Sequence, residues 1–461
     1  MTAHQSITFN TRLKRAVTES ETTPLVFLGN FEVEERWASG ECTLPRLAAP
    51  GGIAVVNRMD AFAILLGTAV DHVVLKSSPD PDHLSHLEGL GLDLPTVHAV
   101  ADQDPLRVVT EDILADPAAL QVLAGLGTSG AWLSAHGISD VEEQLARHTG
   151  LALAGPTAAV CKAVNSKVYS VRLAEQLGLR QPPSWTCTDL GELDSAVDAA
   201  AVLVEQGRPV VVKEAFGVSG KGMTVVDRVV RLRRLHRIIQ ERAERAGSDR
   251  AAFVLQEWVP KQTDINYQFL VSRNGRVEFD FVKEAVTEAG VHRGHRIPAQ
   301  LPAADLDVLR DAAEALGKRL RADGYFGVVG VDAMVDLSGR LYPIIEINAR
   351  NNMSTYQVPV QERALAPDQM MIAKHYPLTL TDPVPFAVLR RQLADLLLAQ
   401  PGREGLVVAN HATLNARPPS TDAFTGRLYA LLVADSSSRL EALDGAVAAR
   451  LGALDERQAA R

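Results

Sequence analysis

The sequence, 461 residues long, predicts a mixed α/β and α+β fold built from successive units. Residues 23–150 alternate short apolar runs with helix-like stretches, the pattern of an open α/β domain with a mostly parallel sheet. Beyond Pro183 the strands follow one another through short turns that contain glycine, as in antiparallel hairpins. After Tyr356 this pattern loosens. We therefore expect three units, at residues 1–154, 155–379 and 380–461, the last being a small C-terminal α/β appendage.

The composition excludes several classes of function. A net charge of −9 and the lack of a basic run with interleaved aromatic residues argue against a nucleic-acid partner. The densest basic patch, Arg231–Arg237, has helical spacing and is followed by acids, so we interpret it as a solvated helix face. Three widely spaced cysteines fit a reducing compartment, without a disulfide framework or a zinc site. The N-terminus lacks the apolar h-region of a secretory signal peptide, and no apolar run is long enough to cross a bilayer. We therefore expect a cytoplasmic protein without a membrane partner.

A helix is expected to connect the first unit to the second. Asn165 or Ser166 is a suitable N-cap and Gly178 a suitable C-cap, and Pro182 prevents the helix from continuing. Lys167 falls in the first turn of this helix. An exposed helix lysine is the default expectation, and contact with a phosphate is the alternative.

Residues 326–352 predict a hairpin in which two apolar runs rich in Val and Ile flank a polar turn that contains glycine. A turn centred on Ser338 places Asp332 across from Ile344 and diagonal to Glu346, with even-numbered residues of both strands on one face. The acids are therefore expected to project together.

The hairpin predicts a divalent metal site. Asp332, Glu346 and Asn348 offer hard oxygen ligands that suit Mg²⁺, with Mn²⁺ as the alternative, and phosphate oxygens and water would complete the coordination. Arg350 follows on the same face, where its fork could bind a phosphate or a developing oxyanion. Any single acid here could be a solvated residue of an exposed hairpin face, but four polar groups at alternate positions in apolar strands favour a site.

A second candidate segment follows an apolar strand that ends at Lys213. The loop Gly217–Gly222 comes next, and its glycines allow close backbone approach to phosphate oxygens while the lysine supplies a point charge. The spacing is not that of a Walker loop. Alone, the loop fits a plain flexible turn as well as a phosphate lid. Its candidate contact residues are Ser219, Gly220, Lys221 and Gly222.

The next strand ends just before Pro260 and has the form of a hinge. Its backbone groups could contact an adenine edge, and an indole could pack nearby; an edge strand that stops at a proline is the alternative. The candidate residues are Gln256, Glu257, Trp258 and Val259.

Taken together, these residues resemble the ATP-grasp superfamily of carboxylate–amine ligases, over Gly155 to Tyr356. The matching pieces are NSK at 165–167, VVVKEAFGVSGKG at 210–222, the QEWV hinge, and D…EINAR from 332 to 350. The resemblance implies a nucleotide held between two subdomains, with a lid subdomain at about 181–260. It further implies Lys167 and Lys213 on the phosphates, the glycine loop as a lid, Gln256 to Val259 on the adenine, Asp264 facing the ribose, and Asp332, Glu346 and Asn348 on magnesium.

Within this superfamily the chain looks like the pheganomycin-type peptide ligases, which carry a distinctive pre-ATP-grasp domain. The supporting phrases are LGNFEVEERWA, GPTAAVCKAVNSK, EINARNNMSTY and GRLYALLVAD. Residues 1–154 would then be the pre-ATP-grasp domain and 155–379 the ATP-grasp domain. The hinge departs from the commonest pattern, because Gln256 stands where an acid is frequent.

The implied activity is ATP-dependent formation of an amide between an amino acid or modified amino acid and an amine. An acyl phosphate would form with release of ADP, and Arg350 would stabilise the oxyanion when the amine attacks. The expected partners are small-molecule or peptide substrates, and a homodimer is left open. Further candidate substrate residues are Arg293, His295, Arg296, Ser354 and Thr355; a basic surface loop is the alternative for the first three, and His295 is also a candidate base.

Three rival interpretations stay open at this point. An amino acid–carrier-protein ligase would use the same acyl phosphate with a thiol nucleophile. A biotin-dependent carboxylase would share the ATP site, although no AMKM-like biotinyl segment is present in the sequence. A non-catalytic nucleotide-binding module would keep the pocket without the chemistry, and the complete set of two acids, an amide and an arginine weighs against it.

Overall fold

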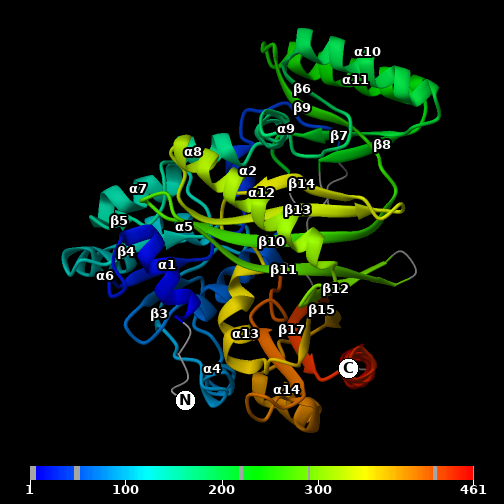
Figure 1. Cartoon of the computed structure of the whole chain (residues 1–461). Coiled ribbons are helices and arrows are strands. Elements are labelled where there is room, and N and C mark those ends of the chain that lie inside the picture. The colour runs from blue at the N-terminus through cyan, green and yellow to red at the C-terminus, as the bar shows by residue number, and fades with distance from the viewer. Residues whose placement is uncertain (1–6, 46–51, 218–221, 289–290, 419–422, 460–461) are drawn as a thin grey trace.

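The computed structural model describes residues 7–45, 52–217, 222–288, 291–418 and 423–459. These residues form three β-sheets, each covered by helices (Figure 1). In the described part of the chain no helix is both long and apolar enough to span a membrane.

The N-terminal domain is the predicted open α/β unit. Its parallel sheet has the strand order β3-β2-β1-β4-β5, with the first strand at the centre, so the chain winds outward in both directions. The strands are β1 (Leu25–Leu28), β2 (His72–Leu75), β3 (Thr96–Ala99), β4 (Trp132–Ala135) and β5 (Ala152–Leu153). The helical segments are α1 (Phe9–Thr18), α2 (Val33–Trp37), α3 (Gly52–Asn57), η1 (Arg58–Leu66), α4 (Pro81–Gly89), α5 (Val109–Ala115), α6 (Pro117–Thr128), α7 (Asp140–Thr149) and α8 (Ala158–Val164).

The predicted connecting helix is α9 (Lys167–Gln176). Ser166 is its N-cap residue, and Gly178 adopts a left-handed conformation with φ of 64° just beyond its end, where glycine carries no steric cost. Lys167 is therefore fixed in the first turn of a short helix.

The next unit, residues 184–257, lies within the range 181–260 where the sequence predicts a lid subdomain, and we use that name for it. Its antiparallel sheet has the order β6-β9-β7-β8 and carries two helices on its outer face, which stand clear of the rest of the molecule in Figure 1. The basic patch lies on α11, where Arg231 and Arg233 pair with aspartates on the exposed side, so it is a solvated face as predicted. The elements are β6 (Ser184–Asp189), α10 (Leu190–Glu205), β7 (Val210–Glu214), β8 (Met223–Val226), α11 (Val229–Arg245) and β9 (Arg250–Glu257).

The largest sheet is antiparallel and has the order β14-β13-β10-β11-β12-β15-β17-β16. The long amphipathic helix α12 packs on it over a core that contains Tyr267, Phe269 and Leu316, all fully buried. The strands are β10 (Lys261–Val271), β11 (Val277–Glu288), β12 (Val291–Ile297), β13 (Gly327–Asp336), β14 (Leu341–Asn348), β15 (Met370–Leu380), β16 (Gly405–Asn410) and β17 (Phe424–Ala434). The helical segments after β12 are α12 (Ala303–Ala322), η2 (Thr355–Gln357), α13 (Val358–Ala364), α14 (Phe386–Leu393), η3 (Ala394–Leu396) and α15 (Ser437–Ala459).

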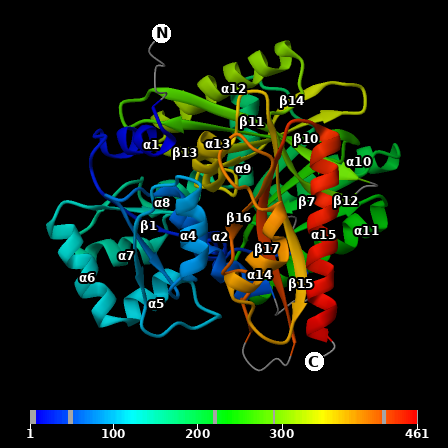
Figure 2. The same cartoon turned by 90° about the horizontal axis from the view of Figure 1, so that it is seen from below.

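The C-terminal residues continue this sheet. β15 pairs with β17 from Met370 to Leu380, and β16 pairs with β17 on the far side. The long helix α15 lies along these strands (Figure 2). The predicted appendage is therefore joined to the main body by a continuous sheet, and the boundary expected at residue 380 coincides with the end of one of its strands.

Candidate functional site

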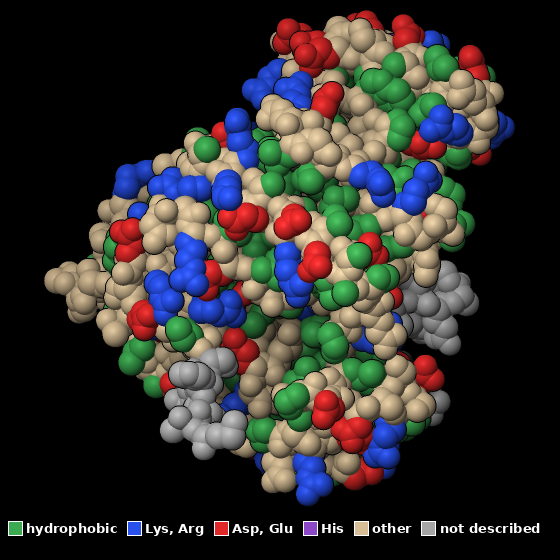
Figure 3. Space-filling view, viewed as in Figure 1, with side chains coloured by type: hydrophobic (Ala, Val, Ile, Leu, Met, Phe, Trp, Pro, Cys, Tyr) green, Lys and Arg blue, Asp and Glu red, His purple; other side chains and the backbone are tan. Residues whose placement is uncertain are grey.

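A cavity of about 510 Å³ lies between the lid subdomain and the large sheet. In Figure 3 the lid subdomain forms a distinct lobe above the body. We call the β13–β14 side, with Asp332, Glu346, Asn348 and Arg350, the cavity floor, and the β7–β9 side, with Lys213 and Gln256 to Val259, the cavity roof. The sequence-predicted residues that line this cavity are Lys167, Lys213, Gly222, Gln256, Glu257, Trp258, Val259, Asp264, His295, Asp332, Glu346, Asn348, Arg350 and Ser354.

The hairpin of the floor differs in register from the sequence-based expectation. Asp332 lies directly across from Glu346, not from Ile344, while Met334 lies across from Tyr342. Three residues of β14 therefore face one residue of β13, which is a bulge. Pro343 lies in it, and because proline has no N–H to donate to the ladder, this is where the regular pairing is interrupted. The bulge brings the two acids closer together than the regular hairpin would.

The two acids share a desolvated spot at the base of the cavity. The surrounding protein and the charge of Glu346 raise the pKa of Asp332 to about 6. Amide groups partly compensate, because Asn266 Nδ2 donates to Asp332 Oδ1 at 2.9 Å and Asn348 Nδ2 donates to Asp332 Oδ2 at 3.2 Å. On the other strand Glu346 Oε1 accepts from Lys167 Nζ at 2.7 Å.

This donor set fits a hard divalent cation. Two neighbouring carboxylates whose negative charges disfavour one another are ligands that Mg²⁺ accepts. Asn348 lies beside them with its Nδ2 toward Asp332 and its Oδ1 toward Arg350, so its amide would have to turn over to offer the ion an oxygen. No group of three or more acid, histidine or cysteine side chains placed to hold a metal ion occurs within the described ranges. The remaining coordination positions would therefore fall to water and to oxygens of a substrate.

Two lysines approach the floor from above. Lys213, on β7, is buried, and its Nζ donates to Gln256 Oε1 at 2.7 Å; burial lowers the pKa of Lys213 to about 8. Lys167 Nζ also donates to the carbonyl of Gly217, at 2.7 Å, at the start of the glycine loop. Both ammonium groups are thus held near the acids by neutral or acidic acceptors. Ser219, Gly220 and Lys221 of the loop lie outside the described residues.

The polar side chains of the hinge bind protein neighbours that the sequence did not predict. Gln256 is turned toward Lys213 and also donates to Ser184 Oγ at 2.8 Å. Glu257 forms an ion pair with Arg208, at 2.8 and 2.6 Å. The backbone N–H of Trp258 donates to the carbonyl of Pro209 at 2.8 Å, although its indole remains partly exposed beside the cavity. Adenine recognition through the hinge remains a prediction.

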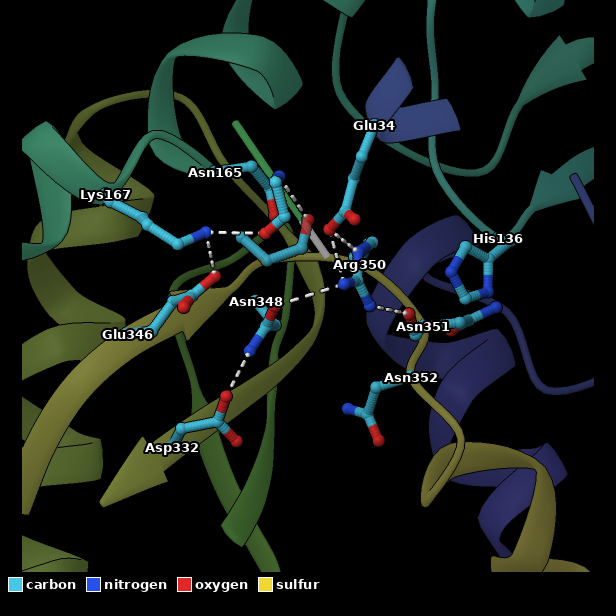
Figure 4. Close-up of polar contacts among 12 residues, drawn as sticks. Glu34, His136, Asn165, Lys167, Asp332, Glu346, Asn348, Arg350, Asn351 and Asn352 are labelled. Carbon is cyan, nitrogen blue, oxygen red and sulfur yellow. Dashed lines mark hydrogen bonds and ion pairs between the residues drawn. The ribbon is translucent and has the colours of Figure 1, made fainter. Parts of the chain in front are cut away.

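Arg350 is held by a residue of the N-terminal domain. Its Nε donates to Glu34 Oε1 at 2.7 Å and its Nη2 pairs with the same oxygen, while Nη2 also donates to Asn348 Oδ1 at 3.1 Å and Nη1 to the carbonyl of Asn351 at 2.9 Å. Figure 4 shows Glu34 reaching down from α2 to this guanidinium. Sequence reasoning placed Arg350 near the acids but gave no partner for it.

The substrate-side predictions are corrected in part. His295 lines the cavity, but its neighbour Arg296 points to the other face of the sheet, where it pairs with Glu284 at 2.7 Å. Thr355 is fully buried, and its hydroxyl donates to Gln268 Oε1 at 2.7 Å instead of facing the cavity. The side chain of Arg293 lies outside the described residues.

Asp264 and several residues missed by the sequence reasoning complete the cavity wall. Asp264 is half-buried and pairs with Lys261 at 2.5 Å. Asn266 lies directly across from Asp332 on the neighbouring strand β10. Because side chains alternate between the two faces of a strand, the sequence could have placed Asn266 on the same face as Asp264. The other lining residues that sequence reasoning did not assign to the site are Pro182, Gly217, Met223, Lys261, Ile265, Ala333, Met334, Ile345, Asn352 and Met353.

Comparisons with known proteins identify two domain families in the chain. Residues 59–151 match the family model described as "Pre ATP-grasp domain", and residues 167–380 match "Carbamoyl-phosphate synthase L chain, ATP binding domain". Residues 167–380 are an ATP-grasp domain, and the pre-ATP-grasp domain that the resemblance implied precedes it.

The curated relatives that the chain matches are named for different enzyme activities. The chain is 30% identical over 220 residues to a [butirosin acyl-carrier protein]–L-glutamate ligase of Niallia circulans, covering 46% of this chain and 49% of that protein. It thus spans about half the length of this curated relative, and less of the carbamoyl phosphate synthase chains that it also matches.

Two solved structures share the fold. The ADP complex of an N5-carboxyaminoimidazole ribonucleotide synthetase superposes with a TM-score of 0.51 at 13% identity, over 94% of this chain and 98% of that one. A biotin carboxylase from Campylobacter jejuni has a TM-score of 0.51 at 14% identity, over 84% of this chain and 86% of that one. At such identities the likeness establishes the fold alone.

Proposed function

We propose that this ATP-grasp chain is a ligase that joins a carboxylate, from an amino acid or modified amino acid, to an amine through an acyl phosphate. The observation that carries the proposal is the convergence of two lysines and the facing Asp332–Glu346 pair on one cavity between lid and sheet. The lysines would neutralise a triphosphate from one side, and a divalent cation held by the acids would neutralise it from the other. A module that only bound nucleotide would have no need of a desolvated acid pair beneath an arginine.

The first step is phosphoryl transfer to the acid. A carboxylate oxygen of the substrate attacks the γ-phosphorus of ATP, the bond to the β–γ bridging oxygen breaks, and ADP leaves with that electron pair. Lys167 and Lys213 bind the phosphate oxygens, and a Mg²⁺ held by Asp332, Glu346 and Asn348 would neutralise the charge of the transferred group.

The second step forms the amide. The amine nitrogen attacks the acyl carbon, the carbon–oxygen bond to phosphate breaks, and inorganic phosphate leaves with the electron pair while the amine loses a proton. Arg350 lines the cavity next to the acids and would donate an N–H to the oxyanion. His295 lines the same cavity and is the candidate acceptor of the proton.

The acid substrate would lie on the floor beyond Asp332, toward Asn266 and Ser354. Ser354 Oγ donates to Asn266 Oδ1 at 3.2 Å, and both side chains line the cavity. This part of the wall offers neutral amide and hydroxyl groups, which suit the polar, zwitterionic backbone of an amino acid or short peptide. The acyl phosphate is prone to hydrolysis, so closure of the lid subdomain over the cavity would protect it.

A carrier-protein ligase is the second candidate. The supporting observation is the 30% identity to a relative named as a [butirosin acyl-carrier protein]–L-glutamate ligase. In that case the thiol of a carrier protein would attack the same acyl phosphate and give a thioester. The two candidates share the first step and differ only in the nucleophile.

The test is product analysis after incubation with ATP, Mg²⁺, pooled amino acids and short peptides. We expect ADP release that depends on both an acid and an amine, together with a new amide mass that survives neutral hydroxylamine. A product found only on an added carrier protein and cleaved by neutral hydroxylamine would support the second candidate. ADP binding without any acid-dependent turnover would contradict both.

A further inference from the structure

We propose that Glu34 of the N-terminal domain is a positioning residue that sets the orientation of Arg350 for the amide-forming step. The inference rests on the proposed function, and it gives the pre-ATP-grasp domain a direct part in the reaction. Glu34 lies on α2, and 316 positions separate it from Arg350 in the sequence. Nothing in the local pattern of either segment predicts this contact.

The ion pair between Glu34 and Arg350 is shielded from solvent, and it uses only one of the two carboxylate oxygens. The side chains of Glu34 and Arg350 are each 11% exposed. The two contacts that the guanidinium makes with Glu34, through Nε and Nη2, go to the same oxygen, Oε1. The other oxygen, Oε2, is buried and has no hydrogen-bond partner in the described part of the chain. An ion pair selected only for stability would satisfy both oxygens, because an unpaired buried acceptor is costly.

The hydrogen bonds of Arg350 leave one direction open. A guanidinium has five N–H donors in one rigid plane. Glu34 takes two of them, Asn348 Oδ1 takes the second N–H of Nη2, and the carbonyl of Asn351 takes one N–H of Nη1. Four donors are therefore engaged by the protein, and the fifth, on Nη1, is the one that can reach a substrate oxyanion. Glu34 determines the direction of that donor because it fixes the plane.

The same contact extends to the acid pair. Asn348 accepts from Arg350 through Oδ1 and donates through Nδ2 to Asp332 Oδ2 at 3.2 Å. The chain Glu34–Arg350–Asn348–Asp332 thus links the N-terminal domain to the cavity floor (Figure 4).

The backbone around Arg350 is held independently of Glu34. Asn165 Nδ2 donates to the carbonyl of Ala349 at 3.0 Å, and the N–H of Asn351 donates to the carbonyl of His136 at 2.9 Å. α2 is anchored as well, because Trp37 is buried and its indole N–H donates to the carbonyl of Ile138 at 3.0 Å. Loss of the Glu34 charge should therefore loosen the guanidinium, which keeps its contacts with Asn348 and Asn351, without unfolding either segment.

The experiment compares Glu34→Gln with Glu35→Gln, the exposed neighbour on the same helix. ADP release is measured at saturating acid and amine, and the affinity for Mg²⁺–ADP is measured by calorimetry. We expect Glu34→Gln to lower kcat by about 10- to 100-fold, with the ADP dissociation constant and the melting temperature close to wild type. Glu34→Asp, which keeps the charge on a shorter stem, should recover part of kcat. Glu35→Gln should match the wild type.

Other results would overturn the inference. One is a Glu34→Gln variant that keeps at least about half of wild-type kcat; another is a parallel loss of kcat, ADP affinity and melting temperature, which marks a structural role. A third is a Glu34→Asp variant no better than Glu34→Gln. If the wild-type protein itself shows no turnover that depends on acid and amine, the proposed function fails and this inference fails with it; if only Glu34→Gln behaves as wild type, the proposed function stands.

Discussion

The floor of the cavity carries charged side chains that hold one another in a network, whereas the roof presents one buried lysine and a hinge whose polar side chains each bind one or two neighbouring residues. On the floor, Asp332 accepts from two amides and Arg350 is engaged by three residues. On the roof, Lys213 has the single acceptor Gln256. A preorganised network suits stabilisation of a transition state, and a lone point charge suits binding of phosphate. Floor variants should therefore lose turnover, and roof variants should lose affinity.

Replacement of Asp332 by Asn should give the largest effect. The carboxylate would hold Mg²⁺, and loss of several kcal/mol of charge stabilisation corresponds to a fall in kcat on the order of 10³-fold. The melting temperature of the metal-free protein should be unchanged or higher, since the substitution removes a carboxylate whose ionisation is disfavoured by burial and by the charge of Glu346. ADP release and differential scanning fluorimetry in EDTA measure the two effects.

The control for this substitution is Asp311→Asn, an exposed acid on α12. It removes the same charge from the chain far from the cavity and should leave kcat unchanged. A fall of less than about tenfold for Asp332→Asn would mean that this acid does not hold the metal, and the floor would lose its distinction from the roof.

Lys213 should control nucleotide affinity and its pH dependence. Phosphate binds the protonated amine, and burial sets the pKa of Lys213 to about 8 in the free protein. Affinity is therefore full below pH 8 and declines above it, and the dissociation constant for Mg²⁺–ADP should rise by about tenfold between pH 7 and pH 9. Lys213→Met should weaken ADP binding by roughly 10- to 100-fold at pH 7 and abolish this pH dependence.

Lys213→Arg is the matched control for the pH effect. An arginine stays protonated throughout this range, so the variant should bind ADP with an affinity that does not change between pH 7 and pH 9. Calorimetry at both pH values would settle the matter. Equal pH dependence in the wild type and in Lys213→Arg would assign the ionisation to another group.

The sequence predicted the floor better than the roof, for a physical reason. Two acids and an amide at alternate positions of apolar strands must share a face, because the side-chain period of a strand is two residues. That argument gave Asp332, Glu346 and Asn348 together. It missed the direct pairing of the acids because it assumed a regular hairpin, although Pro343 in the strand was a visible sign of a bulge.

The same periodicity, applied to β12, would have avoided an error. His295 and Arg296 are adjacent in a strand, so only one of them can face the cavity; the structure turns His295 inward and Arg296 outward. The contact between Arg350 and Glu34 could not have been predicted from strand periodicity. Glu34 comes from another domain, and such a contact follows from tertiary packing that no local pattern records. The directions of Gln256 and Thr355 likewise depend on neighbours brought by folding.

Gln256→Glu should raise the pKa of Lys213, the buried lysine of the roof. The new carboxylate would lie within hydrogen-bond distance of Lys213 Nζ, where Gln256 Oε1 is now 2.7 Å away. An opposite charge at this distance raises the pKa of a lysine. The loss of ADP affinity above pH 8 should therefore move to higher pH, with at most a several-fold change at pH 7. An unmoved transition would show that the lysine leaves this acceptor before nucleotide binds.

Glu257→Gln should give the smallest effect, although the residue lies in the hinge. Its side chain pairs with Arg208, which is 45% exposed, and solvent weakens such a pair. If the hinge contacts adenine through its backbone, removal of this charge should change the ADP dissociation constant by less than about twofold, and kcat not at all. Calorimetry with ADP and GDP measures the point directly. A loss of ADP affinity greater than about tenfold would mean that the carboxylate itself reads the base, and the roof would then recognise nucleotide through side chains as the floor does.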